Sequence, residues 1–454
     1  MIHLYEQNGY KICLDVHSGA VHLPDDTAYD LLPFTCEDMT GDIPEAAVNA
    51  LSEKYPSEDI METWGELYDL HKTGQLHARD DYARFAGGMG PAPIKSMCLN
   101  IAHDCNLACG YCFAGKGGFG GDRVLMSGDV GKAAIDFLIE QSAERRNLEV
   151  DFFGGEPLMN FDAVKSVVGY ARSLEKAHGK NFRFTITTNG LLLDDDSINF
   201  INQEMHNCVL SIDGRPGIND RLRVDRGGSG CYGRIVPKFQ QLVAGRGGKD
   251  YYARATYTKY NLDFAGDVLH LYRLGFRHIS AEPVVAGRDE PFAITEADLP
   301  RIFDEYEKLA LILLEMKKNG EHISFFHFLI DLDQGPCAIR RLRGCSSGNE
   351  YVAVTPSGDV YPCHSFVGDK SWRMGSVLDK SFDQGVKERF AKTNIYSKEE
   401  CKNCWAKFYC SGGCHAINHQ QTGDLLTPFP LYCLMQKKRL ECAIMMQAAA
   451  TTPL

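Results

Sequence analysis

The 454-residue chain has no apolar run that approaches the ~18 consecutive residues of a membrane-spanning helix. Residues 1–6 lack the basic stretch followed by an apolar stretch that marks a secretory signal peptide. Positive charge is not in excess either, because 48 lysines and arginines against 60 aspartates and glutamates give a net charge of −12. We therefore expect a cytoplasmic protein that binds neither membranes nor nucleic acids. A hydrophobic content of 44% and a charged content of 24% are ordinary for a globular protein, and the length suits roughly three domains.

Cysteine is the abundant residue, with 17 in the chain. In a reducing cytosol structural disulfides are rare, so the thiols need another explanation. Some cysteines are scattered, and we expect each of these to be buried as a small hydrophobe. They are Cys13, Cys36, Cys98, Cys208, Cys231 and Cys442. The others cluster within 105–112, 337–363 and 401–433, which indicates zinc or iron–sulfur ligation.

The first region, residues 1–74, has the pattern of a small separate module. Hydrophobic alternation over 10–16 predicts a strand, and a turn leads to a second strand from Val21. Helical patterns follow near 27–32, 44–55 and 57–72. A β-hairpin followed by three helices resembles a winged helix. Residues 75–95, which contain a Gly- and Pro-rich stretch, read as a linker.

Strand and helix patterns alternate over residues 96–320. The predicted strands are 97–102, 148–153, 182–188, 207–212, 251–257 and 278–282, with helices between them and a long amphipathic helix over 296–319. Such β–α units predict an α/β fold with a parallel sheet, open or curved into a partial (β/α)6 barrel. Chemistry in these folds lies at the carboxyl ends of the strands. Residues 321–454 form a cysteine-rich third domain with a hairpin turn at 356–359.

The sharpest motif follows the first predicted strand of this region. Cys105, Cys109 and Cys112 lie on one loop and can hold three corners of a cubane cluster, which leaves the fourth iron without a protein ligand. Structural zinc usually takes four protein ligands, so zinc fits this loop less well, although zinc or plain thiols stay possible at this stage.

A second motif, Gly154-Gly155-Glu156-Pro157, follows the second strand. Adjacent glycines allow the backbone to approach a ligand closely. Together with the three-cysteine loop, this motif resembles the radical S-adenosylmethionine (radical SAM) superfamily over about residues 96–290. The resemblance implies that the open iron chelates the amino and carboxylate groups of SAM. Reduction of the cluster then cleaves SAM to a 5′-deoxyadenosyl radical, which abstracts hydrogen from a substrate.

The same resemblance implies further contacts to SAM. Gly154, Gly155 and Glu156 would hold its amino group, Tyr111 would lie against the adenine, and Arg223 would bind the carboxylate, for which a guanidinium is well suited. Thr187, Asn189 and Ser211, at strand ends, would border the ribose. Ordinary turn and cap chemistry is the alternative for these last three residues, and a surface ion pair is the alternative for Arg223.

The C-terminal cysteines resemble the SPASM domain, which holds two auxiliary [4Fe–4S] clusters in radical SAM enzymes that modify peptides. The resemblance implies three [4Fe–4S] clusters in all. The outer auxiliary cluster would take Cys401, Cys404, Cys410 and Cys433, and the inner one would take Cys345, Cys363 and Cys414. The inner cluster then has an open iron, unless Cys337 supplies the fourth ligand.

An open inner iron has a chemical use, because a metal lowers the pKa of a bound thiol. A substrate cysteine held there could join a carbon radical to form a thioether. The alternative is dehydrogenation, as in sulfatase maturation, but those relatives carry an Asp base directly after the cysteine that is here Cys363. That position is His364, a candidate base or a structural residue. A non-catalytic metal-binding or electron-transfer module is the third hypothesis.

The N-terminal module resembles the elements that recognise ribosomally made precursor peptides. In these the leader peptide adds a strand to the hairpin edge and packs on the third helix. A DNA-binding winged helix is the alternative, but the acidic residues of the module offer little for phosphate contact. The order of the three regions resembles the thioether-forming maturases of SCIFF (six cysteines in forty-five residues) peptides. The expected partners are a cysteine-rich precursor peptide and an electron donor such as flavodoxin or ferredoxin.

Overall fold

The N-terminal segment forms a three-stranded antiparallel sheet followed by helices. We analysed a computed structural model, which describes residues 1–332 and 338–451. The strands β1 (Ile2–Gln7), β2 (Tyr10–Asp15) and β3 (Val21–His22) are ordered β1-β2-β3, and α1 (Asp26–Leu31), α2 (Glu45–Leu51) and α3 (Ser57–Lys72) come next. The helices match the sequence patterns. The sequence analysis missed β1, in which only Tyr5 and Gln7 are buried, because so short an alternation is a weak signal.

The second sheet carries the β–α units, and its strands are parallel from β4 to β10. These are β4 (Ser96–Ala102), β5 (Asn147–Gly154), β6 (Asn181–Thr188), β7 (Met205–Ser211), β8 (Asp250–Tyr257), β9 (His278–Pro283) and the short β10 (Ser324–Phe325). The predicted parallel α/β sheet is therefore confirmed. All the carboxyl ends of these strands, and the loops that follow them, meet at one edge.

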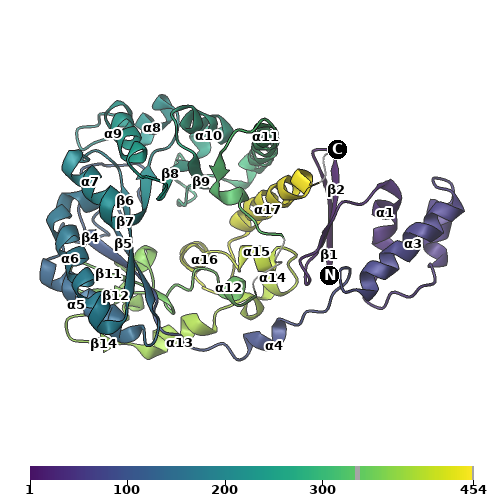
Figure 1. Cartoon of the computed structure of the whole chain (residues 1–454), viewed down its shortest axis with the longest axis horizontal. Helices are drawn as coiled ribbons and strands as arrows, with labels where there is room; N and C mark the ends of the chain where they lie inside the picture. Colours follow the sequence, from purple (N-terminus) through teal and green to yellow (C-terminus); the bar gives the residue numbers. More distant parts are fainter. Residues whose placement is uncertain (333–337, 452–454) are drawn as a thin grey trace.

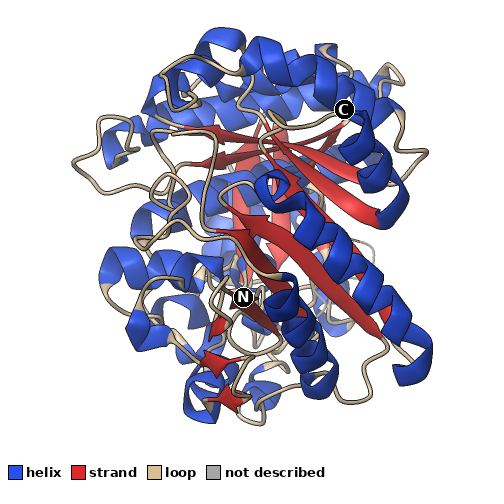
Figure 2. Ribbon diagram, turned by 90° about the vertical axis from the view of Figure 1, so that its left-hand side faces the viewer, coloured by secondary structure: helices blue, strands red, loops and turns tan. Residues whose placement is uncertain are grey.

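Helices cover the convex side of this sheet (Figures 1 and 2). They are α5 (Gly128–Gln141), α6 (Phe161–His178), α7 (Asp195–Glu204), α8 (Pro216–Leu222), α9 (Tyr232–Ala244), α10 (Phe264–Arg273) and α11 (Leu299–Lys318). Along β6, Phe182, Phe184 and Ile186 are buried, whereas Thr185 and Thr187 are only partly buried. Since neighbouring side chains on a strand point to opposite faces, the apolar residues pack on one side and the threonines face the concave side.

The cysteine-rich region continues the same sheet on its other edge. Strand β11 (Tyr351–Val354) pairs in parallel with β4, and β12 (Asp359–Tyr361), β13 (Gly375–Ser376) and β14 (Ser381–Phe382) add antiparallel strands. The turn predicted at 356–359 thus lies in a real hairpin. Shorter helices follow: α12 (Ala338–Arg343), α13 (Gln384–Lys392), α14 (Glu399–Lys402), α15 (Lys407–Cys410) and α16 (His415–Thr422). Figure 1 shows α12, α15 and α16 on the concave side of the large sheet.

The last helix, α17 (Pro430–Thr451), joins the two sheets. It packs along α11 and contacts β1, where Tyr5 OH donates to the Glu441 carbonyl at 3.1 Å and His3 Nε2 lies 3.0 Å from Glu441 Oε1. It also contacts β2 and β3, so the helix packs against all three strands, of which β1 and β3 are the outer two. None of the helices within 1–332 and 338–451 is long and apolar enough to cross a membrane.

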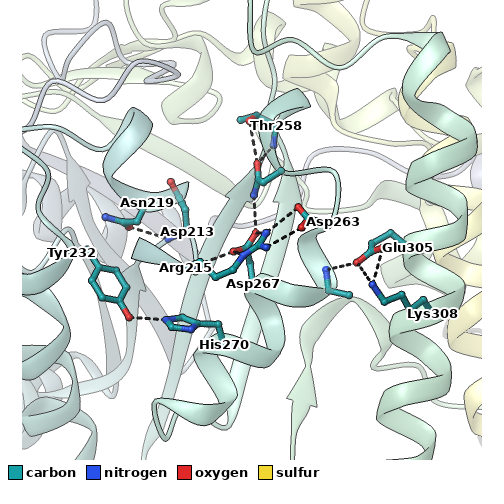
Figure 3. Close-up of polar contacts among 12 residues, drawn as sticks. Asp213, Arg215, Asn219, Tyr232, Thr258, Asp263, Asp267, His270, Glu305 and Lys308 are labelled. Carbon is teal, nitrogen blue, oxygen red and sulfur yellow. Dashed lines mark hydrogen bonds and ion pairs between the residues drawn. The ribbon is translucent and has the colours of Figure 1, made fainter. Parts of the chain in front are cut away.

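The loop after β7 is anchored by a buried carboxylate (Figure 3). Asp267, on α10, is 1% exposed and accepts hydrogen bonds from the backbone N–H of Arg215 at 3.0 Å and from its Nε at 2.7 Å. Asn261 Nδ2 donates to the same carboxylate at 3.1 Å. A side chain at Gly214 would bring a Cβ within 2.3 Å of Asp267 Cβ, so glycine permits this approach. The contact fixes the backbone next to Asp213, a residue of the site described below.

We predict that Asp267→Ala lowers the free energy of unfolding by ~2–3 kcal/mol, because the three donors of Arg215 and Asn261 lose their buried acceptor. The matched control is Asp263→Ala, which removes a carboxylate that also binds Arg215 but is 41% exposed. The control should cost less than ~1 kcal/mol. Anaerobic urea unfolding followed by circular dichroism measures both values, and equal losses would show that Asp267 is no special anchor.

Candidate functional site

The three cysteines of the loop after β4 lie close enough to interact. Burial, followed by the charges of Glu156 and of the nearby Cys109 and Cys112 thiols, raises the pKa of Cys105 to about 12. Two donors point at the Cys105 sulfur: the Leu107 backbone N–H at 3.4 Å and Asn189 Nδ2 at 3.7 Å. Hydrogen bonds to sulfur favour the thiolate, which is the form that ligates metals. The loop thus presents a thiol group, Cys105–Cys109–Cys112, whose chemistry fits an iron–sulfur cluster.

The glycine pair after β5 packs directly against this loop. The backbone N–H of Gly155 donates to the carbonyl of Ala102 at 2.8 Å. A Cβ on Gly155 would lie 2.1 Å from the carbonyl oxygen of Asp104, a distance that no side chain can occupy. Gly154 has a φ of +122°, and a Cβ there would lie 2.3 Å from the carbonyl oxygen of Ala102. Glycine is required at both positions because backbone meets backbone beside Cys105.

Glu156 ties the ends of two strands together. Its carboxylate is fully buried and accepts hydrogen bonds from the N–H of Leu158 at 3.0 Å, the hydroxyl of Thr188 at 2.8 Å and the N–H of Asn189 at 2.7 Å. Burial raises the pKa of Glu156 to about 7. In the structure this side chain therefore positions the ends of β5 and β6. A contact of Gly154, Gly155 and Glu156 with the amino group of SAM stays a prediction.

Tyr111 and Arg223 meet at an aspartate that the sequence analysis did not single out. Tyr111 OH donates to Asp213 Oδ2 at 2.6 Å, and Arg223 Nε lies 3.0 Å from the same oxygen. The guanidinium also lies 5.5 Å from the centre of the Tyr111 ring. Asp213 and Arg223 are both buried, so Arg223 does not form a surface ion pair. The available signal was the position of Asp213 just after the carboxyl end of β7 and directly before Gly214.

The three strand-end residues take different places. Thr187 and Ser211, on β6 and β7, are partly buried at neighbouring strand ends. Asn189 is buried, and its side chain donates to Asn106 Oδ1 at 2.8 Å while accepting from the Leu191 N–H at 3.0 Å. Asn189 thus forms a turn and also touches the cysteine loop. Contacts of these three residues with a ribose stay a prediction.

The C-terminal cysteines separate into two further groups by their mutual interactions. The Cys363 thiol, whose pKa burial raises to about 12, interacts with Cys414 and Cys345, and Cys414 also interacts with Cys345. We call these three residues the inner group. In the outer group, burial raises the pKa of Cys401 to about 12, and its further interactions are with Cys410, Cys433 and Cys404. These are the two sets that the sequence analysis assigned to separate clusters, although their role as ligands is untested.

The thiols of each group are not arranged to bind a single metal ion. Within the described residues, no group of three or more His, Cys, Asp or Glu side chains converges closely enough to hold one metal ion. The members of each group interact without converging, as suits ligands spread over the corners of a cluster. Cys337, the competing ligand of the inner group, lies outside the described residues.

His364 lies between the inner group and the first cysteine loop. It follows Cys363, its ring centre is 4.9 Å from that of Phe153 on β5, and it is 5.5 Å from that of Phe113 in the cysteine loop. Its Nδ1 is 3.4 Å from Tyr351 OH. Burial and then the positive charge of Arg254 lower the pKa of His364 to about 4, so the imidazole is neutral near pH 7.

The scattered cysteines are buried with one exception. Cys13, Cys98, Cys208, Cys231 and Cys442 are buried as expected, but Cys36 is exposed, so that prediction was wrong. Cys98 has more than a packing role, because its thiol interacts with Asp151, Tyr351 and Cys363 on the concave side of the sheet. Asp151 lies opposite Cys98 on the neighbouring β5, and the pairing of β4 with β11, which no sequence pattern signals, adds Tyr351.

Comparisons with known families match both cysteine-rich regions. Residues 89–227 match a 4Fe-4S single cluster domain, and residues 345–405 match SPASM, an iron-sulfur cluster-binding domain. An uncharacterized protein of Methanocaldococcus jannaschii is 30% identical over 63% of this chain and 90% of its own length. A cysteine-type anaerobic sulfatase-maturating enzyme of Clostridium novyi is 24% identical over 71% of this chain and 88% of its own length. The chain belongs to the radical SAM/SPASM family.

Solved structures show the same fold. The native anSMEcpe structure with bound AdoMet has a TM-score of 0.66 at 19% identity, and covers 79% of this chain and 100% of that chain. Streptococcus suis SuiB bound to precursor peptide SuiA has a TM-score of 0.53 at 16% identity, covering 94% of this chain and 97% of that chain. This chain therefore shares the partial barrel and the C-terminal SPASM region with these solved structures.

We predict that Gly155→Ala disrupts the Cys105–Cys109–Cys112 group, because the new Cβ cannot coexist with the Asp104 carbonyl. After anaerobic reconstitution the variant should lack the iron and sulfide of one cluster. Gly169→Ala is the matched control, since nothing lies within 4 Å of a Cβ at that site on α6. Iron and sulfide analysis measures the effect, and full cluster content in Gly155→Ala would contradict the close-packed arrangement.

Proposed function

We propose that the protein is a radical SAM peptide maturase that forms thioether crosslinks in a cysteine-rich precursor peptide, as the maturases of SCIFF peptides do. The observation that carries this proposal is the position of His364. Its ring contacts Phe113, next to the first cysteine group, while its backbone neighbour Cys363 belongs to the inner group. A peptide side chain on the concave side of the sheet would therefore stand within reach of both groups.

The thiol groups would hold three [4Fe–4S] clusters, one on each group, and SAM would bind beside the first. The cluster-domain families matched by this chain and the AdoMet-bound anSMEcpe structure support this assignment. When bound, the first cluster and SAM supply a 5′-deoxyadenosyl radical that removes hydrogen from a substrate carbon. The other requirements of the reaction fall to residues of the chain.

Tyr111, Asp213 and Arg223 would fix the SAM side of the site. The buried Asp213 holds both partners, so the Arg223 guanidinium is already oriented before a ligand carboxylate arrives. Glu156 and Asn189 would hold the cysteine loop and the neighbouring strand ends in one arrangement. These buried contacts need no rearrangement when a ligand binds.

Forming a thioether removes one hydrogen from carbon, one proton from sulfur and one further electron. The hydrogen goes to the deoxyadenosyl group, and the neutral His364 is placed to take the proton. The inner group would hold the centre that orients the peptide sulfur and removes the electron. The described cysteines of this group number three, which leaves a corner for the peptide sulfur.

Sulfatase-type dehydrogenation is the alternative, favoured by the similarity to the Clostridium novyi enzyme. Both reactions begin with the loss of two hydrogens from the peptide, but dehydrogenation of a cysteine gives a thioaldehyde, which water hydrolyses to an aldehyde. Both reactions can therefore consume a thiol without forming a reducible bond, and only the dehydrogenation leaves a carbonyl. Alkylation of the product thiols before and after reduction, combined with hydrazine trapping of carbonyls, distinguishes the two: loss of alkylation that reduction does not restore, with no trapped carbonyl, supports the thioether, and a trapped carbonyl or an unchanged thiol count excludes it.

The N-terminal sheet would recognise the leader of the precursor. A groove of about 1170 Å³ lies beside β3 and α3, lined by Val21 and Leu23, by Leu67 and Leu70, and also by the end of α17 and by residues 330–332. We call it the β3–α3 groove. The groove borders β3, an outer strand of the sheet, at which an extended peptide could add a strand. The peptide-bound SuiB structure, which covers 94% of this chain, supports this role.

We predict that Cys105→Ala makes no 5′-deoxyadenosine but keeps its auxiliary clusters, because the three groups are separate. Chromatography of the reduced reaction and iron analysis measure the two properties. Cys36→Ala is the control, because that thiol is exposed and belongs to none of the groups. Normal SAM cleavage by Cys105→Ala would refute the assignment of the first cluster.

We predict that Leu70→Glu weakens binding of a leader peptide at least tenfold, because it places a charge in the apolar wall of the β3–α3 groove. Met61→Glu is the matched control, since Met61 is on the same helix, 66% exposed and outside the groove lining. Fluorescence anisotropy with a labelled leader measures the affinities. SAM cleavage should be unchanged in both variants, and equal leader affinities would remove the recognition role.

A further inference from the structure

A buried lysine lies between the inner and outer cysteine groups. Lys398 directly precedes α14, the helix that carries Cys401, and is only 1% exposed. Its Nζ donates to the carbonyl of Gly412 at 2.6 Å. Gly412 belongs to the turn between Cys410 of the outer group and Cys414 of the inner group. The Lys398 side chain therefore links the segment that carries Cys401 to the turn between Cys410 and Cys414.

The close fit at Gly412 shows that this position is specific. Gly412 has a φ of +80°, and a Cβ there would lie 3.1 Å from Lys398 Nζ and 3.2 Å from its Cδ. A residue with a side chain would be strained and would crowd the lysine. The turn therefore needs glycine at position 412 to make room for the Lys398 side chain.

The positive charge of Lys398 faces thiols of both groups. Burial lowers the pKa of Lys398, and Cys401 and Cys410 of the outer group and Cys414 and Cys345 of the inner group act in the opposite direction, in favour of its charged form. Within the described residues, no carboxylate oxygen forms an ion pair with it inside 4.0 Å. Lys407, which is also buried (2% exposed), does have a carboxylate partner, because its Nζ lies 2.7 Å from Asp80 Oδ2.

An ammonium group buried without a carboxylate is costly unless other negative charges surround it. Thiolates that ligate a cluster are such charges. Each electron that enters a cluster adds further negative charge, and a fixed cation nearby stabilises that reduced form. Because the lysine faces two groups, its effect should act on both.

We propose that Lys398 is a positioning residue that holds the turn between the two auxiliary clusters and raises the reduction potentials of both together. The inference rests on the proposed cluster assignment. It adds a residue that links the redox properties of the inner and outer clusters, so that an electron taken up at one is not trapped there.

The experiment compares Lys398→Gln and Lys398→Arg in the full-length, reconstituted Cys105→Ala protein, in which the remaining signals come from the auxiliary clusters. Redox titration followed by electron paramagnetic resonance measures the midpoint potential of each. Glutamine keeps a donor for Gly412 but removes the charge, so both midpoints should shift to more negative values. Arginine keeps the charge, so both should stay near the parent values.

Lys402→Gln is the matched control. Lys402 ends α14, the helix that Lys398 precedes, but it is 43% exposed and pairs with Glu399, so solvent screens its charge and the midpoints should not move. Unchanged midpoints in Lys398→Gln, a shift in one cluster alone, or an equal shift in Lys398→Arg would overturn the proposal.

Cluster content separates the remaining outcomes. If Lys398→Gln fails to assemble the auxiliary clusters while Lys398→Arg assembles them, the positive charge is required already at assembly, which supports the proposal. If both variants lose them, the shape of lysine matters rather than its charge, and the proposal is wrong. If the parent protein holds no auxiliary clusters, the cluster assignment itself fails, whereas intact clusters with unmoved midpoints refute only the role of Lys398.

Discussion

The candidate site depends on one close approach of two backbones. Gly154 and Gly155, at the end of β5, lie against the segment from Ala102 to Cys105 at the end of β4, with no room for a Cβ on either glycine. This contact sets the first cysteine at the carboxyl edge of the parallel sheet. The buried Glu156 then extends the constraint to β6 by accepting the Asn189 N–H, and Asn189 reaches back to the cysteine loop. The carboxyl ends of β4, β5 and β6 are thereby held in place around the sulfur of Cys105.

The C-terminal region is placed by the same sheet. Because β11 pairs with β4, the segment that carries Cys363 and His364 starts beside the strand that leads to the first cysteine loop. The rings of His364, Phe153 and Phe113 then close the space between the two thiol groups. Sheet pairing, rather than a flexible tether, therefore fixes where the inner group stands relative to the proposed SAM site.

The N-terminal sheet is fastened to the outer group. The ring of His3 on β1 stacks on Trp405 at 3.9 Å, and Trp405 directly follows Cys404. Asp80, which follows the N-terminal module, binds the buried Lys407 between Cys404 and Cys410. A peptide held at the β3–α3 groove would thus sit on a module that is packed against the loop of the outer group. Recognition and redox chemistry would then share one rigid frame.

The sequence by itself determined the elements and the chemical inventory. Periodicity and apolar runs located β4 to β9: β6 and β8 alternate buried and less buried residues, whereas β4 is buried throughout. Cysteine spacing located the first thiol group, because residues a few positions apart on one loop stay close in any fold. The inner and outer groups were assigned from the resemblance to the SPASM domain. Only the tertiary structure decided which distant residues meet. Strand order and chain reversal bring together residues that no local pattern relates. Three contacts arise in this way: Asp213 with Tyr111 and Arg223, Cys98 with Tyr351, and Lys398 with the thiols of two groups.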